Sequence, residues 1–327
     1  MKDDHVDPLI RDFVRSQSDI DIDRYSGKGG FGELYFGSRK ILGDRVALKF
    51  YALDPMGKAH EEPIILKEIA HENIIPIVDA RILNSQIAYY LTPEISGGDL
   101  QNVIDHDTLS TGDAIRIIQG VLKGLNELHK SPRHLVHRDL KTSNILIDKA
   151  TGQSFLADFG SVKKIPTGSE YVTASKFSFL YRPPEVVVDG HYYKQSDIYQ
   201  VGIILYQVLG GWFPLNRSEK WIPMKFIGKY NQLSPVDQQV FLNNIIDEMI
   251  VKGKLLNLDS LPNYINKRLK SIIRSATAAD IKNRYANCAD FLKALYNYQK
   301  DSKSWKEDNG IIYAYSEKKK KDYRISK

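Results

Sequence analysis

Apolar and polar residues follow strand-like patterns along the first part of the chain, up to about residue 91. These patterns cover residues 21–26, 32–40, 45–51, 75–82 and 86–91. Gly and Asp residues stand between several of these segments, as is common between strands. Residues 58–71 break the series, because Ile64, Ile65, Leu66 and Ile69 favour a helix. We therefore expect an N-terminal sheet interrupted by one helix.

After the break at residues 96–99, apolar residues recur at helical spacing. Helices are predicted for residues 114–129, 195–210, 236–251, 266–276 and 288–298. A β-rich first quarter followed by a helical remainder indicates an α+β fold with two lobes. Residues 1–20 mix a short apolar stripe with charged residues, which predicts a short helix or an arm.

The composition narrows the class of protein. The chain has 327 residues, of which 42% are apolar and 26% charged, so it is neither disordered nor fibrous. A lone cysteine, Cys288, excludes an internal disulfide framework. No apolar run reaches the ~18 residues of a membrane span, and the acidic start does not resemble a signal peptide. We expect a reducing, cytoplasmic location.

The formal net charge of +6 is unevenly placed. Residues 302–327 carry eight basic and four acidic groups, whereas residues 1–24 carry four basic and seven acidic groups. A basic tail can contact acidic partners, membranes or nucleic acid, but a solvated, frayed end is the simpler interpretation. Its apolar residues could instead pack back on the domain: Trp305, Ile311, Ile312, Tyr313 and Tyr315.

Residues 27–34 read G-x-G-x-x-G-x-L between two strand-like stretches. Such glycines let the backbone turn sharply and bring amides close to phosphate oxygens. A tight hairpin or a dinucleotide-binding fold could carry the same string. The dinucleotide fold needs a helix directly after the glycines, yet residues 33–40 have a strand-like pattern.

The sequence Val46-Ala47-Leu48-Lys49 places a lysine on an apolar strand. A buried lysine needs a partner, because an unpaired buried charge is costly. The helix that follows offers Glu61 and Glu62. The alternative is a surface lysine whose charged head reaches solvent.

The most specific pattern is residues 136–144, Val-His-Arg-Asp-Leu-Lys-Thr-Ser-Asn. It combines the carboxylate of Asp139, the ammonium of Lys141 and the carboxamide of Asn144. Nineteen residues after Asp139 comes Asp158, followed by Phe and Gly. The oxygens of Asn144 and Asp158 suit Mg²⁺, which prefers oxygen ligands.

Together with Pro183-Pro184-Glu185, these motifs resemble, in order, those of the eukaryotic-type (Hanks-type) protein kinase family. The resemblance runs from about Ile20 to about Tyr298. The position of Lys141 is similar to that in the serine/threonine type, and residues 284–292 resemble the last helix of bacterial members. The family implies a bilobal fold, with a β-rich small lobe at about 20–95 and a mainly helical large lobe at about 96–299. Residues 1–19 would be an arm or short helix, and 300–327 a basic tail.

The resemblance implies ATP and Mg²⁺ as cofactors and a protein with a Ser/Thr hydroxyl as substrate. Lys49 would hold the α- and β-phosphates and pair with Glu62. Asp139 would accept the substrate proton, and Lys141 would steady the transferring phosphoryl group. Asn144 and Asp158 would hold Mg²⁺. The backbone amides of the glycine loop would cover the phosphates: Gly27, Lys28, Gly29, Gly30, Phe31 and Gly32.

The same resemblance implies an adenine site between the lobes. Leu34 and Ala47 would lie above the ring and Leu146 below it. The linker at 91–95 would present the Pro93 carbonyl and the Ile95 amide. Asp99 would either reach the ribose hydroxyls or cap the following helix, and both roles remain open.

Other positions are expected to be structural. Glu185 and Arg284 should form a buried ion pair, and Asp197 should bond the backbone of the catalytic loop. Ser178 should bond the catalytic aspartate and lysine. The activation segment, 158–185, is expected to be autophosphorylated at Thr173 or Ser175, because an arginine precedes Asp139.

Two features depart from the family pattern. Pro63 directly follows Glu62, which predicts a short helix starting near Glu62. The segment 212–262 is longer than its counterpart in the minimal family core. We expect it to form either an extra helix that covers the core or a docking surface. The main alternative function is a pseudokinase scaffold that binds nucleotide without phosphoryl transfer; a small-molecule kinase is a weaker one. Nucleic acid is not expected as a partner, because no aromatic–basic motif accompanies the tail.

Overall fold

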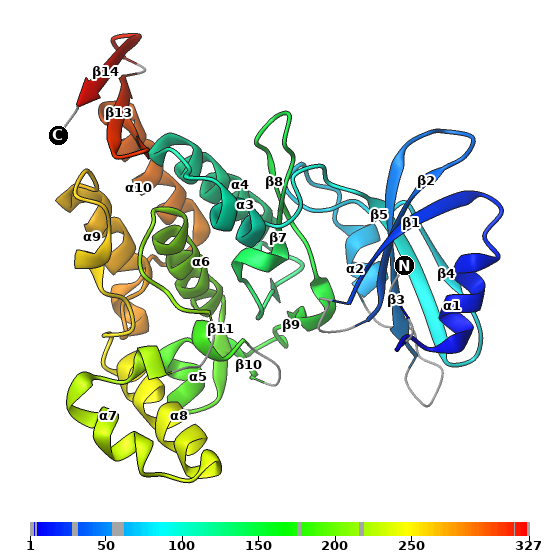
Figure 1. Cartoon of the computed structure of the whole chain (residues 1–327), viewed down its shortest axis with the longest axis horizontal. Coiled ribbons are helices and arrows are strands. Elements are labelled where there is room, and N and C mark those ends of the chain that lie inside the picture. The colour runs from blue at the N-terminus through cyan, green and yellow to red at the C-terminus, as the bar shows by residue number, and fades with distance from the viewer. Residues whose placement is uncertain are drawn as a thin grey trace.

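The computed structural model describes residues 3, 5–27, 32–53, 62–174, 178–215, 219–316 and 318–325. They form a sheet-rich small lobe and a larger helical lobe, which lie at opposite ends of the view in Figure 1. The predicted α+β fold of two lobes is therefore confirmed. No helix in the described part of the chain is long and apolar enough to cross a membrane.

Five antiparallel strands make the small-lobe sheet, in the order β1-β2-β3-β5-β4. Their bounds are Ile20–Ser26, Leu34–Arg39, Arg45–Ala52, Asp79–Ile82 and Ile87–Pro93, numbered β1 to β5 along the chain. The predicted strand at 75–82 is shorter than expected, because Ile75 instead donates its backbone N–H to the Leu156 carbonyl of the large lobe. Pairing of β3 with β5 places Lys49 opposite Tyr90.

The N-terminal segment is a short helix, α1 (Pro8–Arg15), capped by Asp7. Ile10 and Val14 on this helix are buried and join Tyr35 and Phe50 in the core of the small lobe. The helix therefore covers one side of the sheet (Figure 1).

The large lobe is built from eight helices in the described residues. They are α3 (Leu100–His106), α4 (Thr111–His129), α5 (Pro184–Val188), α6 (Lys194–Val208), α7 (Met224–Asn231), α8 (Pro235–Val251), α9 (Lys267–Ala276) and α10 (Cys288–Asp301). Every residue from 196 to 208 is buried, so α6 is the central helix of the lobe. Helix α2 (Glu62–Glu68) belongs to the small lobe and ends three residues before the predicted end at residue 71. The predicted residues 58–61 lie outside the described part.

Short strand pairs hold the loops between these helices. Strand β6 (Leu135–Val136) pairs with β9 (Lys163–Lys164), β7 (Ile145–Ile147) with β8 (Ser154–Leu156), and β10 (Tyr171–Thr173) with β11 (His191–Tyr193). The catalytic loop and the activation segment are thereby fixed to the large lobe at several points.

Helix α8 lies within the long segment 212–262. Leu242, Ile246 and Ile250 recur along one face of this helix and are buried in the main core. The interpretation of this segment as a core-covering helix is confirmed.

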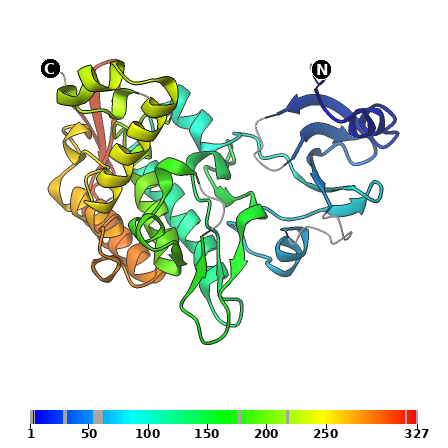
Figure 2. The same ribbon diagram turned by 90° about the horizontal axis from the view of Figure 1, so that it is seen from below.

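The expectation of a frayed C-terminal tail is wrong. Residues after α10 form a three-stranded antiparallel sheet of β12 (Ser304–Asp308), β13 (Ile311–Ser316) and β14 (Lys321–Ile325). In both views this sheet lies on the side of the large lobe away from the small lobe (Figures 1 and 2), and its strand β12 packs against α4. Ser304 Oγ accepts the amide of Gly112 at 3.0 Å, and Trp305 stacks on Tyr264. Trp305 thus packs back on the domain, as the alternative interpretation expected, whereas Tyr313 and Tyr315 remain exposed.

Candidate active site

Lys49 of β3 is held by two carboxylates. Its Nζ lies 3.0 Å from both carboxylate oxygens of Glu62 and 2.9 Å from Oδ1 of Asp158. The Lys49 side chain is only 14% exposed, so these charges compensate one another away from water. Glu62 and Pro63 lie next to each other in helix α2, and the Lys49–Glu62 pair is formed with the proline in place.

The protonation of this cluster follows from its geometry. Burial alone would lower the pKa of Lys49, but Glu62 and Asp158 raise that pKa above its usual value. Burial alone would raise the pKa of Asp158, but the Lys49 ammonium lowers it below its usual value. At neutral pH, Lys49 is therefore a cation and Asp158 an anion.

Glu62 also holds the start of the activation segment. Its Oε1 accepts the backbone N–H of Phe159 at 2.7 Å. Asp158 itself has a φ of 58°, in the left-handed region that non-glycine residues rarely adopt. Such strained residues persist where surrounding contacts fix them, typically at functional sites.

A second cluster surrounds Asp139, which is 5% exposed. Its Oδ2 accepts a hydrogen bond from Lys141 Nζ at 2.9 Å and from Asn144 Nδ2 at 3.1 Å. Its Oδ1 accepts the Ser178 hydroxyl at 2.7 Å, and Lys141 also bonds Ser178 Oγ at 3.1 Å. The structure thus joins the catalytic loop to the activation segment through Ser178, as the sequence predicted.

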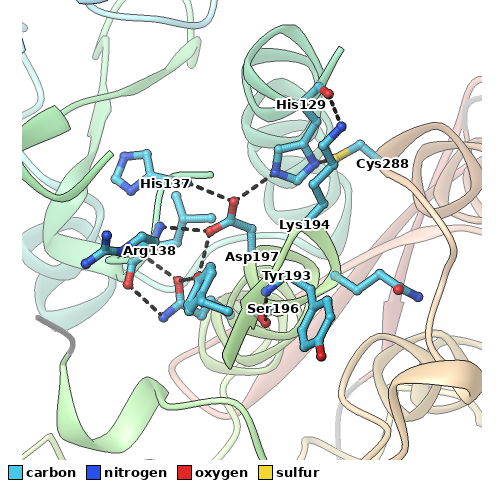
Figure 3. Close-up of polar contacts among 12 residues, drawn as sticks. His129, His137, Arg138, Tyr193, Lys194, Ser196, Asp197 and Cys288 are labelled. Carbon is cyan, nitrogen blue, oxygen red and sulfur yellow. Dashed lines mark hydrogen bonds and ion pairs between the residues drawn. The ribbon is translucent and has the colours of Figure 1, made fainter. Parts of the chain in front are cut away.

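Beneath this loop, Asp197 of α6 binds backbone groups, as Figure 3 shows. Its two oxygens accept the N–H groups of His137 and Arg138, each at 2.9 Å. His129 Nε2 lies 2.8 Å from Asp197 and Cys288 Sγ lies 3.6 Å from His129 Nδ1. Burial would raise the pKa of Asp197, but hydrogen bonding and charge from His129 bring it below the usual value.

The sequence predicted Asp197 but missed two residues that act with it. Gln200 Oε1 accepts the backbone N–H of Leu140 at 2.9 Å. Gln200 lies three residues after Asp197 on the same helix, so helical spacing could have identified it. His129 ends α4, and no spacing in the sequence links it to Asp197.

Glu185 and Arg284 form the predicted ion pair. Two guanidinium nitrogens lie 2.7 and 2.6 Å from the two carboxylate oxygens, and the Arg284 side chain is fully buried. The pair ties the end of the activation segment to the residues before α10.

The residues predicted to hold the nucleotide base lie on both lobes. Leu34 begins β2, Ala47 lies on β3, and Pro93 ends β5. Leu146 lies on β7 in the large lobe and pairs with Asp99 in an isolated bridge. Ile95 follows in the linker, where its carbonyl accepts the amide of Gly98.

Two of the glycine-loop residues and Asp99 can be placed. A Cβ on Gly32 would lie 1.8 Å from the carbonyl oxygen of Phe50, so only glycine fits there. Gly27 ends the segment after β1, and residues 28–31 (Lys28, Gly29, Gly30 and Phe31) lie outside the described residues. Asp99 caps α3 by accepting the Asn102 N–H at 2.8 Å. Of the two roles expected for Asp99, the structure therefore shows the helix cap.

The predicted metal ligands fit a hard cation. Asn144 donates its Nδ2 to Asp139, which leaves its carboxamide oxygen as the possible ligand. The amide next to Asp158, that of Ala157, bonds the Asn144 carbonyl at 3.0 Å and links the two segments. Among the described residues, no group of three or more His, Cys, Asp or Glu side chains could hold a metal ion. The two oxygen donors suit Mg²⁺, which keeps waters or phosphate oxygens as its other ligands.

Comparison with known proteins supports the family. The family model described as the protein kinase domain matches residues 21–297. The chain is 28% identical over 281 residues to a probable serine/threonine-protein kinase, PknB, of Lactococcus lactis, covering 81% of this chain and 40% of that protein. It is 27% identical over 234 residues to the serine/threonine-protein kinase TIO of Arabidopsis thaliana, covering 69% of this chain and 17% of that protein. It is 30% identical over 237 residues to the probable serine/threonine-protein kinase PBL16 of Arabidopsis thaliana, covering 66% of this chain and 58% of that protein.

The chain therefore spans less than two thirds of the length of each of these relatives. The match to the domain itself covers most of this chain. With the motifs in order and their side chains assembled in the structure, the chain belongs to the protein kinase family.

Proposed function

We propose that the chain transfers the γ-phosphoryl group of Mg-ATP to serine or threonine hydroxyls of proteins. The observation that carries this proposal is the contact of Asp139 with both Lys141 and Ser178, at 2.9 and 2.7 Å. The serine/threonine type is supported by Lys141 and by the names of the relatives.

In the proposed reaction, Asp139 orients the substrate hydroxyl and accepts its proton. The hydroxyl oxygen forms a bond to the γ-phosphorus as the bond to the bridging oxygen breaks, and ADP leaves. Lys141 lies beside Asp139 and would offset the negative charge of the transferring group. Phosphoryl transfer depends mainly on positioning and charge neutralisation, which this set of side chains can supply.

ATP would bind with its phosphates on Lys49 and under the glycine loop. Leu34, Ala47 and Leu146 would contact the adenine ring, and the Pro93–Ile95 linker would bond its edge. Asn144 and Asp158 would hold Mg²⁺, which when bound neutralises phosphate charge. The buried Lys49 ammonium supports this arrangement, because its fixed position suits an anionic ligand.

The direct test is transfer of labelled γ-phosphate to a generic protein substrate such as casein, with Mg²⁺ present. We expect labelled phosphoserine or phosphothreonine after hydrolysis and no label with Asp158→Asn. Label on tyrosine would contradict the assignment of serine or threonine as the acceptor residue. No transfer to any protein, by a chain that still binds ATP, would support a pseudokinase scaffold.

We also propose that the activation segment is autophosphorylated at Thr173 or Ser175. Thr173 is exposed at the end of β10, and Ser175 lies outside the described residues. Burial lowers the pKa of Arg138, and a phosphate beside its guanidinium would favour the charged form. Phosphosite mapping of active protein tests this, and absence of phosphate between residues 161 and 182 would contradict it.

A further inference from the structure

A cavity lies in the large lobe where the C-terminal sheet meets the end of α6. Its volume is about 390 Å³, which is within the range of about 300–1,000 Å³ typical of small-molecule sites. Its walls come from the loop between α3 and α4, the end of α6, the residues before α9 and the turn between β12 and β13. The described residues that line it include none of the clusters around Lys49 and Asp139. The cavity is therefore separate from the proposed active site.

The alternation of side chains along β12 directs Glu307 toward this cavity. Trp305 stacks on the ring of Tyr264, so the face of β12 that carries Trp305 packs against the domain. Residues two apart in a strand lie on the same face, which places Glu307 on the side of Trp305. Lys306 and Asp308 lie on the opposite face, where both are exposed and neither lines the cavity.

Contacts within the protein hold these walls in place. The backbone N–H of Trp305 donates to the Thr111 hydroxyl at 2.9 Å, which fixes β12 to α4. Asn309 and Gly310 have φ values of 49° and 76°, as a tight two-residue turn between β12 and β13 requires. A preformed cavity needs little ordering when a ligand enters it.

Two carboxylates line the cavity without a cationic partner. Asp107 and Glu307 are the charged side chains among its described lining residues. Within the described part of the chain, neither carboxylate takes part in an ion pair or a hydrogen bond. Burial raises the pKa of Tyr264 above its usual value, and the negative charge of Glu307 raises it further. Tyr264, which also lines the cavity, therefore experiences the charge of Glu307.

Charged neighbours do not neutralise these carboxylates. The Nζ of Lys303 lies 3.7 Å from the centre of the Tyr323 ring, and Lys306 lies on the exposed face of β12. His106 Nδ1 bonds a carbonyl of its own helix at 2.8 Å, and Asp105 accepts a hydrogen bond from another side chain of that helix. No described Lys, Arg or His lines the cavity, so a cationic ligand would supply the missing charge partner.

The end of α6 acts in the same direction. The helix ends at Val208, and both Val208 and the C-cap residue Leu209 line the cavity. The C-terminal end of a helix carries a partial negative charge, which stabilises cations close to the last turn. Two separate features, the carboxylates and the helix end, therefore favour a positive charge in this cavity.

Gln207 offers a hydrogen-bond donor to the same cavity, which it lines although it is only 6% exposed. Its Oε1 accepts the Tyr181 hydroxyl at 2.8 Å, whereas no described residue accepts a hydrogen bond from its Nε2. A buried donor without an acceptor costs free energy, so a ligand that brings an acceptor oxygen gains by bonding it. Apolar side chains of the wall suit an alkyl chain: Ile104, Leu109 and Pro262.

We propose that this cavity binds an organic cation: an ammonium or guanidinium group on a short alkyl chain with a hydrogen-bond acceptor at its other end. Asp107 and Glu307 hold the cation, and Gln207 donates to the acceptor. A free small molecule and the Lys or Arg residue of a polypeptide both carry this chemistry. The inference goes beyond the proposed function and does not depend on it.

Isothermal titration calorimetry on the full chain, without ATP, tests the proposal. The probe is Nα-acetyl-lysine amide, and its matched neutral analogue, Nα-acetyl-norleucine amide, lacks the ammonium group. We expect the lysine probe to bind at least about tenfold more tightly than the neutral analogue. The peptide acetyl-Ala-Ala-Lys-Ala-Ala-amide separates the two sources. Binding as tight as that of the probe indicates a polypeptide ligand, and loss of binding indicates a free small molecule.

Substitutions locate the binding. Glu307→Gln should weaken binding of the lysine probe about tenfold, and Asp107→Asn should weaken it less, because Asp107 is exposed. Asp308→Asn is the matched control, since it removes the neighbouring carboxylate on the opposite face of β12 and should leave the affinity unchanged. The two cavity variants lie on separate elements and thermal unfolding shows whether each is folded, so either one alone can test the proposal.

Three results would overturn the inference. The first is no saturable binding of either lysine-containing probe up to about 10 mM. The second is equal binding of the neutral analogue. The third is an equal effect of Asp308→Asn and Glu307→Gln, which would show only a general attraction of cations to an acidic surface.

Discussion

At the scale of single residues, each lysine of the site is paired with one or two carboxylates. Lys49 contacts Glu62 and Asp158, and Lys141 contacts Asp139. Each of these side chains is at most 26% exposed. Buried charges persist only with partners at hydrogen-bond distance, and removal of one partner leaves the other uncompensated.

The Lys49–Asp158 pair predicts a pH dependence of stability. Because the folded-state pKa of Asp158 is lowered, the pair contributes stability above about pH 4, the usual pKa of an exposed aspartate. That contribution is lost as the pH falls through the lower, folded-state pKa. Asp158→Asn should therefore be less stable than the wild type at about pH 6, and the difference should shrink below about pH 4.

Urea unfolding across this pH range measures the difference. The exposed Val240→Ala provides a control whose difference from the wild type should not change with pH. A gap between Asp158→Asn and the wild type that stays constant down to acid pH would show that the ion pair contributes nothing.

Loss of the Ser178 hydroxyl should disturb the positions of the Asp139 and Lys141 side chains. Its hydroxyl bonds Asp139 and Lys141 together. Hydrogen bonds to charged groups are worth about 1.5–3 kcal/mol, so Ser178→Ala should lower kcat about tenfold to a hundredfold. Ser178→Thr keeps the hydroxyl and should restore most of the rate, which steady-state kinetics can check. Equal losses in both variants would argue for a packing defect instead.

Among the elements, α8 shows how the long segment 212–262 is held to the large lobe. One face of the helix buries Leu242, Ile246 and Ile250, whereas Gln239 and Val240 on its other side are exposed. The buried face fixes the helix against the main core.

The buried face of α8 leads to a stability prediction. Leu242 is 2% exposed, so Leu242→Ala should lower the free energy of unfolding by about 2–5 kcal/mol through lost burial and a cavity. Val240→Ala on the exposed face should change it by less than about 0.5 kcal/mol. Thermal or urea unfolding measures both, and similar values for the two variants would mean that α8 does not cover the core.

Some helices and strands could be predicted from the sequence better than others. Helix α6 was evident from its apolar run, and β3 from its pattern around Lys49. The C-terminal sheet was missed because its strands are short and a run of four lysines, 318–321, suggested a solvated end. Those lysines lie at and after the turn into β14, where they remain exposed without preventing the strands from pairing.

Across the whole molecule, distant segments meet at a few buried contacts. The pair of Arg284 with Glu185 joins residues 99 positions apart, and Asp197 links α6 to the catalytic loop. These contacts make the site dependent on the folding of the large lobe.

The Arg284–Glu185 pair predicts a large effect on stability. Arg284→Met leaves the Glu185 carboxylate without its cation, so the free energy of unfolding should fall by about 3–5 kcal/mol. The double variant Glu185→Leu with Arg284→Met should recover part of that loss, because neither charge is then buried alone. Urea unfolding of both variants checks this, and strictly additive losses would contradict the role as a pair.

Much of the site could be predicted because its residues are contiguous in the sequence. Asp139, Lys141 and Asn144 lie within six residues, and the resemblance of their motif to that of the kinase family implied phosphoryl-transfer chemistry. The contact of His129 with Asp197 could not be predicted, because the two residues lie on different helices and only packing brings them together. The nucleotide-binding roles of Leu34, Ala47 and Leu146 stay predictions.

Phosphate transfer from ATP by this chain can be measured most directly as the intact mass of the protein after incubation with Mg²⁺ and ATP, beside that of Asp139→Asn. We expect added mass in steps of one phosphate for the wild type and none for the variant. An unchanged wild-type mass, together with no transfer to a protein substrate, would contradict the proposed kinase activity.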